Sequence, residues 1–245
     1  MINLVIDIGN SRTKIALFNQ HDLMFNVPVD QLTTDHVKML KDEYAQLNKA
    51  ILSSVKPDDD ELKLFLAENF GQFIELNEQT SLPIENLYET PETLGKDRLA
   101  AAIGANELFP DQNLLVIDAG TAITYDLVSE KNQFIGGNIS PGLEMRFKAL
   151  NQFTGKLPLV SYKDDWQMIG RNTTEAIRAG VQNGILSEIT HTIDYFNRNY
   201  QNLQIIMTGG DSIFFDKKLN YSIFVHFNLT LIGLNRILEH NAKNK

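Results

Sequence analysis

The sequence predicts a two-lobed α/β fold in which one order of strands and helices occurs twice, each lobe being a mixed sheet with flanking helices. Two hydrophobic, strand-like runs, 3–8 and 114–117, each lead into an Asp-x-Gly turn. After each turn come a second strand, a third strand and then helices. A chain of 245 residues has enough core for two lobes, which we place at residues 1–110 and 111–245.

The first half alternates short β-rich runs with two polar helices and an alanine-rich one. Strands are predicted at residues 3–8, 13–18, about 24–29, 50–55 and 73–76. Helices are predicted over 35–47, 58–69 and 95–109. Residues 77–93 contain two prolines and no clear period, which predicts a long loop, and loops of this length are often functional.

The second half repeats the pattern and adds the longest helix. Strands are predicted at 114–117, 123–128, 133–139 and 203–207. Helices are predicted over 143–151, 172–198 and 229–240, with a turn into a short helix at 208–212. In the longest helix apolar residues recur every fourth position, at Ile177, Val181, Ile185, Ile189 and Ile193. Its start resembles a capping box, with Asn172 followed three residues later by Glu175.

Composition excludes several classes of function. The chain has no cysteine, which excludes disulfide scaffolds, thiolate metal sites and cysteine nucleophiles. Its formal net charge of -9, without clusters of Lys and Arg, argues against a nucleic-acid partner. No apolar run approaches the length of a membrane span. We therefore expect a cytoplasmic protein with neither nucleic acid nor membrane as a partner.

The two Asp-x-Gly turns offer more polar groups than a turn needs. Glycine lets backbone N–H groups approach phosphate oxygens, and an aspartate such as Asp7 can hold Mg²⁺. The side chains that could add hydrogen bonds or positive charge are Ser11, Arg12, Thr13, Lys14, Thr121 and Thr124. A single such turn is explained by an aspartate that satisfies turn amides. Two copies at matching positions favour a shared nucleoside triphosphate.

Five motifs give this pattern a family resemblance. DIGNSRTK (7–14), DAGTAITYD (118–126) and TGGDS (208–212) resemble the phosphate-1, phosphate-2 and adenosine motifs of the actin-like ATPase and sugar-kinase superfamily. TLGKDRLAAAIGA (93–105) and GGNISPG (136–142) resemble the type III pantothenate kinases in particular. The resemblance extends from Asp7 to LTLIGL near the end of the chain, although residues 18–90 add little to it.

The resemblance implies a fold and an activity. The fold would be the two-lobed, duplicated actin-like (ribonuclease H-like) ATPase fold. The activity would be transfer of the ATP γ-phosphoryl group to the 4′-hydroxyl of pantothenate, giving 4′-phosphopantothenate in the first step of coenzyme A biosynthesis. It also implies Mg²⁺ with ATP, a monovalent cation (K⁺ or NH₄⁺) at Asp118, and a homodimer in which the partner subunit completes the substrate pocket. Asp7 is the candidate Mg²⁺ ligand.

The resemblance also implies the residues that contact the nucleotide. The expected ATP contacts are Asp7, Ile8, Gly9, Asn10, Ser11, Arg12, Thr13, Lys14 and Thr121. Two further acids have open roles. Asp126 could support the metal site, and Asp211 could lie near adenosine or cap a helix.

Asp97 is the expected catalytic residue. It occupies the place of the family's aspartate in the G-x-D-R motif, at the start of a predicted helix, where it would accept the proton of the substrate hydroxyl. Spacing alone favours a plainer interpretation, in which its charge complements the helix dipole. The resemblance reverses that preference.

The substrate contacts implied by the resemblance are Tyr88, Gly95, Lys96, Asp97, Arg98 and Thr173. Arg98 could grip the carboxylate of pantothenate through two hydrogen bonds, or it could be a surface arginine paired with an acid. Tyr88 could equally be an ordinary half-buried tyrosine. Thr173 could be a first-turn residue beside the Asn172 cap.

Two other functions fit parts of the pattern. A kinase or ATP hydrolase of the same superfamily could act on another substrate, which the GKDR element disfavours. A nucleotide-binding regulator would tolerate loss of the base, whereas Asp97 is intact.

Overall fold

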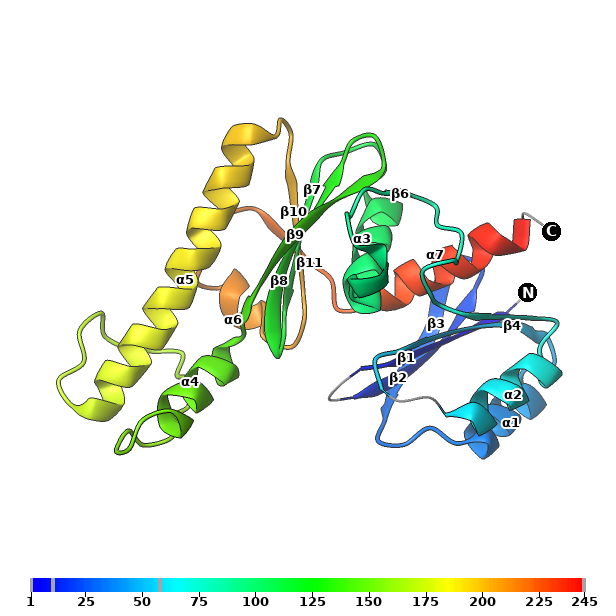
Figure 1. Ribbon diagram of the computed structural model, residues 1–245, viewed down its shortest axis with the longest axis horizontal. Helices are drawn as coiled ribbons and strands as arrows, with labels where there is room; N and C mark the ends of the chain where they lie inside the picture. Colours follow the sequence, from blue (N-terminus) through cyan, green and yellow to red (C-terminus); the bar gives the residue numbers. More distant parts are fainter. Residues whose placement is uncertain (1, 10–11, 57–58, 244–245) are drawn as a thin grey trace. The chain divides into compact units, whose positions relative to one another are not determined.

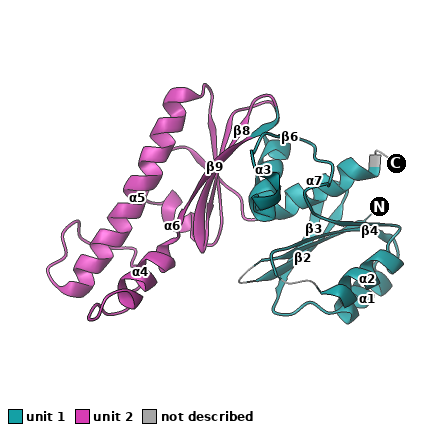
Figure 2. Cartoon of the chain, in the orientation of Figure 1, with its two compact units in different colours: residues 1–110, 132–134, 228–245 teal, residues 111–131, 135–227 magenta. Residues whose placement is uncertain are grey.

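The computed structural model describes residues 2–9, 12–56 and 59–243 (Figure 1). The chain forms two compact units (Figure 2). Unit 1 comprises residues 1–110, 132–134 and 228–245, and unit 2 comprises residues 111–131 and 135–227. Each unit is described by itself.

Unit 1 contains a five-stranded sheet in the order β3-β2-β1-β4-β5. Its strands are β1 (Ile2–Ile8), β2 (Thr13–Asn19), β3 (Asp22–Val29), β4 (Leu47–Ser54) and β5 (Gln72–Glu75). The first three strands are antiparallel neighbours, whereas β4 runs parallel to β1 and β5 parallel to β4.

Helices flank both faces of this sheet. On one face α1 (Thr34–Glu43) and α2 (Asp60–Asn69) bury alternate strand residues such as Leu4, Ile6 and Leu52. On the other face lies α7 (Leu229–Lys243), which packs on β1, β4 and α3 (Lys96–Leu108) (Figure 1).

The second sheet has six strands in the order β11-β10-β7-β8-β9-β6. They are β6 (Glu85–Asn86), β7 (Leu114–Ala119), β8 (Ala122–Ser129), β9 (Gln133–Pro141), β10 (Gln204–Thr208) and β11 (Ile223–Val225). β6 pairs only with residues 133 and 134, which belong to unit 1.

Three helices belong to unit 2. They are α4 (Leu143–Gln152), α5 (Thr173–Asn199) and α6 (Ser212–Asp216). The isoleucine and valine stripe of α5 is buried against the sheet, as its four-residue spacing predicts.

The duplication predicted from the sequence is confirmed by the strand orders. In both sheets the hairpin strands and the third strand lie side by side, and two further strands, β4 and β5 or β10 and β11, lie beyond the first one. The order β3-β2-β1-β4-β5 in unit 1 thus has its counterpart in β9-β8-β7-β10-β11.

Three details differ from the predictions. The helix predicted over 35–47 ends at Glu43, because Leu47 is buried in β4 and pairs with β1. The loop 77–93 contains β6 and one turn of 3₁₀ helix at Pro91–Thr93. The short strand β11 was not predicted, since three residues give too little periodicity.

The predicted division of the chain assigned its last helix to the second lobe. In the structure α7 lies in unit 1, where it packs against α3. A sequence pattern shows that this helix is amphipathic but does not show which core it covers. The lobes 1–110 and 111–245 otherwise stay a prediction.

Candidate functional site

The tip of the β1–β2 hairpin places Asp7 among polar groups. Asp7 faces Lys14 across the antiparallel pair, and Ser53 of β4 occupies the matching position on its other side. The turn is closed by the Gly9 backbone N–H, which donates to the Arg12 carbonyl at 3.0 Å. Asn10 and Ser11, two of the predicted nucleotide contacts, lie outside the described residues.

The environment of Asp7 brings in a second carboxylate. The pKa of Asp7 is raised to about 6, chiefly because the carboxyl group is buried. The Lys14 ammonium lowers this pKa, but by less than burial raises it. The carboxylate of Asp97 raises the Asp7 pKa further, and the Ser53 side chain lowers it. Asp7 and Asp97 are thus electrostatic neighbours within unit 1, although 90 positions separate them in the sequence.

The start of α3 presents Asp97 at a helix N-terminus. The Asp97 carboxylate accepts a hydrogen bond from the Arg98 backbone N–H at 2.8 Å. A Cβ on Gly95 would lie 2.6 Å from that carboxylate, so glycine leaves room for this conformation. Lys96 reaches back to β4, where its ammonium donates to the Ser54 carbonyl at 3.4 Å. The GKDR stretch is therefore joined to the end of the strand beside Asp7.

Arg98 is buried, which rules out the surface-arginine interpretation. Its side chain lies under Tyr88, with the guanidinium carbon 5.6 Å from the ring centroid. Tyr88 in turn meets the edge of Phe134 at 6.1 Å between centroids, and its backbone N–H donates to Asn86. Unit 1 thus contains the predicted substrate residues 95–98, at the start of α3, and Tyr88 from the long loop.

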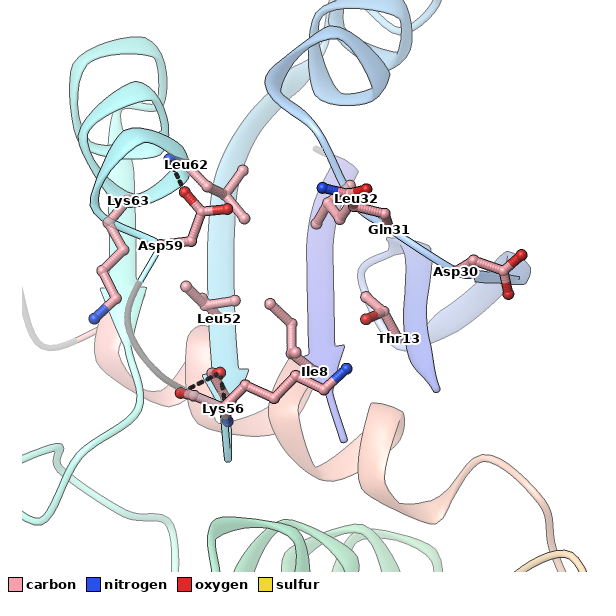
Figure 3. A pocket seen from close by; sticks show the side chains of 11 residues that line it. Ile8, Thr13, Asp30, Gln31, Leu32, Leu52, Lys56, Asp59, Leu62 and Lys63 are labelled. Atoms are coloured by element: carbon pink, nitrogen blue, oxygen red, sulfur yellow. Dashed lines mark hydrogen bonds between the residues drawn. The ribbon is translucent and has the colours of Figure 1, made fainter. Parts of the chain in front are cut away.

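The opposite face of the hairpin lines a separate pocket of about 160 Å³ (Figure 3). Ile8 and Thr13 are register partners next to Asp7 and Lys14, so their side chains point to the other side of the sheet. There they meet Leu52 and the start of α2. Any contact of Ile8 or Thr13 with a nucleotide on the Asp7 face would therefore use the backbone.

In unit 2, two glycines allow the DAGTA turn, the GGNISPG segment and the TGGDS segment to pack closely together. A Cβ on Gly142 would overlap the carbonyl oxygens of Gly120 and Thr121. A Cβ on Gly209, which has φ +93°, would overlap the Ala119 carbonyl and lie 2.5 Å from the Asp118 carboxylate. The DAGTA turn thus lies in backbone contact with both the GGNISPG and TGGDS segments.

The predicted residues of unit 2 occupy distinct positions around this turn. Asp118 is at the end of β7, and Thr121 is exposed in the turn, with its carbonyl accepting from the Gly142 N–H at 3.0 Å. Asp126 is buried on β8. Thr173 is exposed in the first turn of α5, whose cap Asn172 accepts from the Glu175 N–H at 3.0 Å.

Asp211 stands at the cap position of α6 without a capping hydrogen bond from its side chain. Its backbone N–H donates to the Ala119 carbonyl at 2.9 Å, beside the DAGTA turn. Burial, and then the Glu144 carboxylate, raise the pKa of Asp211. A sequence motif could not have shown Glu144 or, in unit 1, Ser53 as neighbours of these acids, because each comes from a different element.

No ready-made cluster of metal ligands accompanies these acids. In the part of the chain that the structure describes, no three His, Cys, Asp or Glu side chains gather as a metal site. The same residues include no helix long and apolar enough to cross a membrane.

Solved structures with this architecture identify its class. The chain superposes on a conserved Baf family protein from Campylobacter jejuni, named as a transcriptional activator, with TM-score 0.63 and 23% identity over 98% of this chain and 99% of that one. The activator of 2-hydroxyisocaproyl-CoA dehydratase from Clostridium difficile, solved with ADPNP, gives TM-score 0.56 at 12% identity, covering 100% and 96% of the two chains. A glucokinase from an Antarctic psychrotroph gives 0.51, also at 12%, covering 98% and 99%. The fold is that of the actin-like ATPases and sugar kinases.

Sequence comparison narrows the class to one family. The family model of type III pantothenate kinase matches residues 3–195. The type III pantothenate kinase of Phocaeicola vulgatus is 46% identical over 242 residues, which cover 99% of this chain and 100% of that protein. That of Bacteroides fragilis is 45% identical over 240 residues, 98% of each chain. This chain belongs to the type III pantothenate kinase family, which confirms the resemblance seen in its motifs.

Proposed function

We propose that this protein transfers the γ-phosphoryl group of ATP to the 4′-hydroxyl of pantothenate. Family membership supports the reaction. The observation that carries it in this chain is the electrostatic coupling within unit 1 between Asp97, in the first turn of α3, and the buried Asp7 of β1, together with the bond from Lys96 to the end of β4 beside Asp7. Phosphoryl transfer needs a positioned hydroxyl and neutralised phosphate charge. Asp97 and Arg98 would position the substrate, whereas Asp7 would serve the phosphates by holding Mg²⁺.

Asp97 accepts the proton of the attacking hydroxyl. Its carboxylate is held at the helix start by the Arg98 N–H, which keeps it oriented while it takes a proton. The buried Arg98 guanidinium binds the carboxylate of pantothenate, with Tyr88 covering it. Gly95 and Lys96 complete the substrate contacts of unit 1, and Thr173 stays a predicted substrate contact.

The hairpin binds the triphosphate. The described residues of the β1–β2 hairpin bind the phosphates, with backbone N–H groups and the Lys14 ammonium as donors, and Thr121 stays a predicted nucleotide contact. Asp7 fits a Mg²⁺ ligand, because its buried carboxylate is a hard oxygen donor next to the expected phosphates. Mg²⁺, when bound, neutralises phosphate charge.

A monovalent cation, K⁺ or NH₄⁺, binds at Asp118. The residue stands at the end of β7, beside the backbone contact of the DAGTA and TGGDS segments, where oxygen donors are close. Without a cation, the Asp118 carboxylate would serve only to accept hydrogen bonds in the turn. The cytoplasmic location expected from the sequence stays a prediction.

The protein acts as a homodimer built on unit 2. A largely apolar groove of about 650 Å³ runs between α4 and α5 and is lined by Arg146, Ala149, Leu150, Phe153, Thr154, Ala176, Ile177, Gly180 and Val181. Phe153 is 86% exposed, and a large apolar surface of this kind favours a protein partner. Thr173 begins α5 next to this groove, which agrees with a substrate pocket completed across the dimer.

The test is mass-spectrometric detection of 4′-phosphopantothenate from ATP, Mg²⁺ and pantothenate, in potassium and in sodium buffer. Product in potassium, with a strong loss in sodium and in Asp97→Asn, would support the reaction, the cation and the base together. Product that survives Asp97→Asn would remove Asp97 as the base. Absence of product while ATP still binds would favour a nucleotide-binding regulator instead.

A further inference from the structure

The C-terminal helix α7 contacts both elements that carry the candidate catalytic carboxylates. β1 carries Asp7, the first turn of α3 carries Asp97, and α7 packs against β1 and α3 within unit 1 (Figure 1). β1 and α3 are far apart in the sequence and are not neighbours in a sheet. The start of α3 is joined to β4 by the bond from Lys96 to Ser54, and α7 packs against both β1 and α3, so the spacing of the two carboxylates depends on these two contacts.

The contact of α7 with α3 is made by backbone. A Cβ on Gly233 of α7 would overlap the carbonyl oxygen of Ala100, and a Cβ on Gly104 of α3 would overlap that of Leu229. The two helices therefore approach more closely than any side chain at these glycines would allow. Ala100 is three residues from Asp97, so this contact lies one helical turn from the candidate base.

A second contact joins the other end of α3 to α7. The Arg236 guanidinium pairs with the Glu107 carboxylate at 2.7 Å. The His21 imidazole lies 3.1 Å from the same carboxylate. The crossing point at the glycines and this ion pair together fix both the distance and the rotation of α3 on α7.

Buried hydrogen bonds fix α7 on the sheet. The side-chain amide of Asn3, at the start of β1, donates to Asn235 at 2.8 Å and to Glu239 at 2.7 Å. Asn235 also donates to the Gln20 carbonyl at 2.8 Å, and Lys49 of β4 pairs with Glu239 at 3.2 Å. These bonds are largely shielded from water, so α7 has one preferred position along β1.

The anchored face of β1 is the face that carries the candidate site. Asn3 and Asp7 are four residues apart on one strand, so their side chains point to the same side of the sheet. Asn3 is fully buried there beneath α7. A displacement of α7 along this face would therefore move α3 relative to Asp7.

We propose that α7 is the element that sets the position of Asp97 relative to Asp7, with Gly233 and Asn235 as its positioning residues. Gly233 sets the approach of α3, and Asn235 fixes the helix on β1. Close-packed interiors transmit such displacements, and a misplacement of about 1 Å can cost roughly a hundredfold in rate. The kinetic part of this inference rests on the proposed function.

The kinetic test compares Gly233→Ala with Gly184→Ala on α5, where an added Cβ has open space. Gly233→Ala should lower kcat roughly tenfold to a hundredfold. Calorimetry should show an unchanged Kd and an unchanged number of sites for a non-hydrolysable ATP analogue. Gly184→Ala should keep the wild-type kcat. The proposal would be overturned if Gly233→Ala kept the wild-type kcat. It would also be overturned if kcat fell only in proportion to the number of nucleotide sites, because unfolded protein would then explain the fall.

Asn235→Ser is the second variant, in case Gly233→Ala does not fold. Asn3 keeps its bond to Glu239 in this variant, and the exposed Gln20 carbonyl can bind water, so folding should survive. It should also lower kcat while the nucleotide Kd stays the same. A wild-type kcat in a folded Asn235→Ser protein would count against the role of Asn235.

A readout without activity separates this inference from the reaction itself. The chain has no cysteine, so Asn26→Cys on β3 and Leu108→Cys at the end of α3 can be spin-labelled as a pair. The label distance should change in Gly233→Ala and not in Gly184→Ala. An unchanged distance would overturn the positioning role, whereas absence of phosphopantothenate from the wild type would overturn only the proposed reaction.

Discussion

At the scale of single residues, the candidate site contains aspartates whose pKa is raised because their carboxyl groups are buried. Asp7 is the clearest case, since burial dominates its raised pKa and the Asp97 carboxylate adds to it. An ionised, buried Asp7 costs folding free energy, and the enzyme would recover that cost when cationic ligands bind. Function and stability therefore oppose each other at this position.

The opposition predicts a pH-dependent effect of Asp7→Asn. Between pH 3.8, the ordinary pKa of an aspartate, and about 6, the folded state holds a proton at Asp7 that the unfolded state has lost. Wild-type stability therefore falls as pH rises through this window. Without Mg²⁺ or nucleotide, Asp7→Asn should therefore be more stable than wild type at pH 7.5, by up to about 3 kcal/mol, with no difference near pH 3.5.

Urea unfolding at several pH values measures this difference. Asp22→Asn, at the exposed start of β3, serves as the control for the loss of one negative charge. A difference between Asp7→Asn and wild type that is the same at every pH would contradict the assignment. Asp7→Asn should also lose kinase activity if the carboxylate serves Mg²⁺ binding.

At the scale of elements, the second hairpin depends on glycines outside it. The DAGTA turn is held by backbone contact with Gly142 and Gly209, from the segments after β9 and β10. Such contacts leave no space for a side chain. The spacing of the three motifs in the sequence therefore reflects one packed cluster in unit 2.

The packing predicts that Gly142→Ala displaces the DAGTA turn. The added methyl would overlap the Gly120 and Thr121 carbonyls, and overpacking of this kind costs about 1–3 kcal/mol. The melting temperature should fall and the KM for ATP should rise. Gly155→Ala, where nothing lies within 4 Å, is the matched control and should change neither. A Gly142→Ala protein with wild-type stability and KM would show that the turn does not depend on this contact.

At the scale of the whole molecule, the apolar groove between α4 and α5 is the surface that the proposed dimer would cover. A groove of about 650 Å³ beside an 86% exposed Phe153 is costly to leave in water. The same helix α5 begins with the predicted substrate contact Thr173. Dimer formation and substrate binding should therefore be lost together.

Phe153→Glu tests this link. A charge at the edge of the groove should convert the dimer to monomer, measured by light scattering after gel filtration, and should raise the KM for pantothenate more than that for ATP. Leu64→Glu, on an exposed position of α2 in unit 1, is the control and should leave both unchanged. A wild type that is already monomeric and active would remove the dimer from the proposal.

The sequence by itself determined the repeated hairpins, the strong α5 helix, the family and the identity of the candidate residues, because these depend on local periodicity and on motifs that are contiguous in the chain. Only the tertiary structure decided that Asp97 acts electrostatically on Asp7, that Arg98 is buried beneath Tyr88, and that α7 returns to unit 1. Those facts depend on which buried faces pack together over long sequence separations. A pattern of apolar residues shows that a face will be covered, whereas its partner is chosen by the shape and hydrogen bonding of the assembled core.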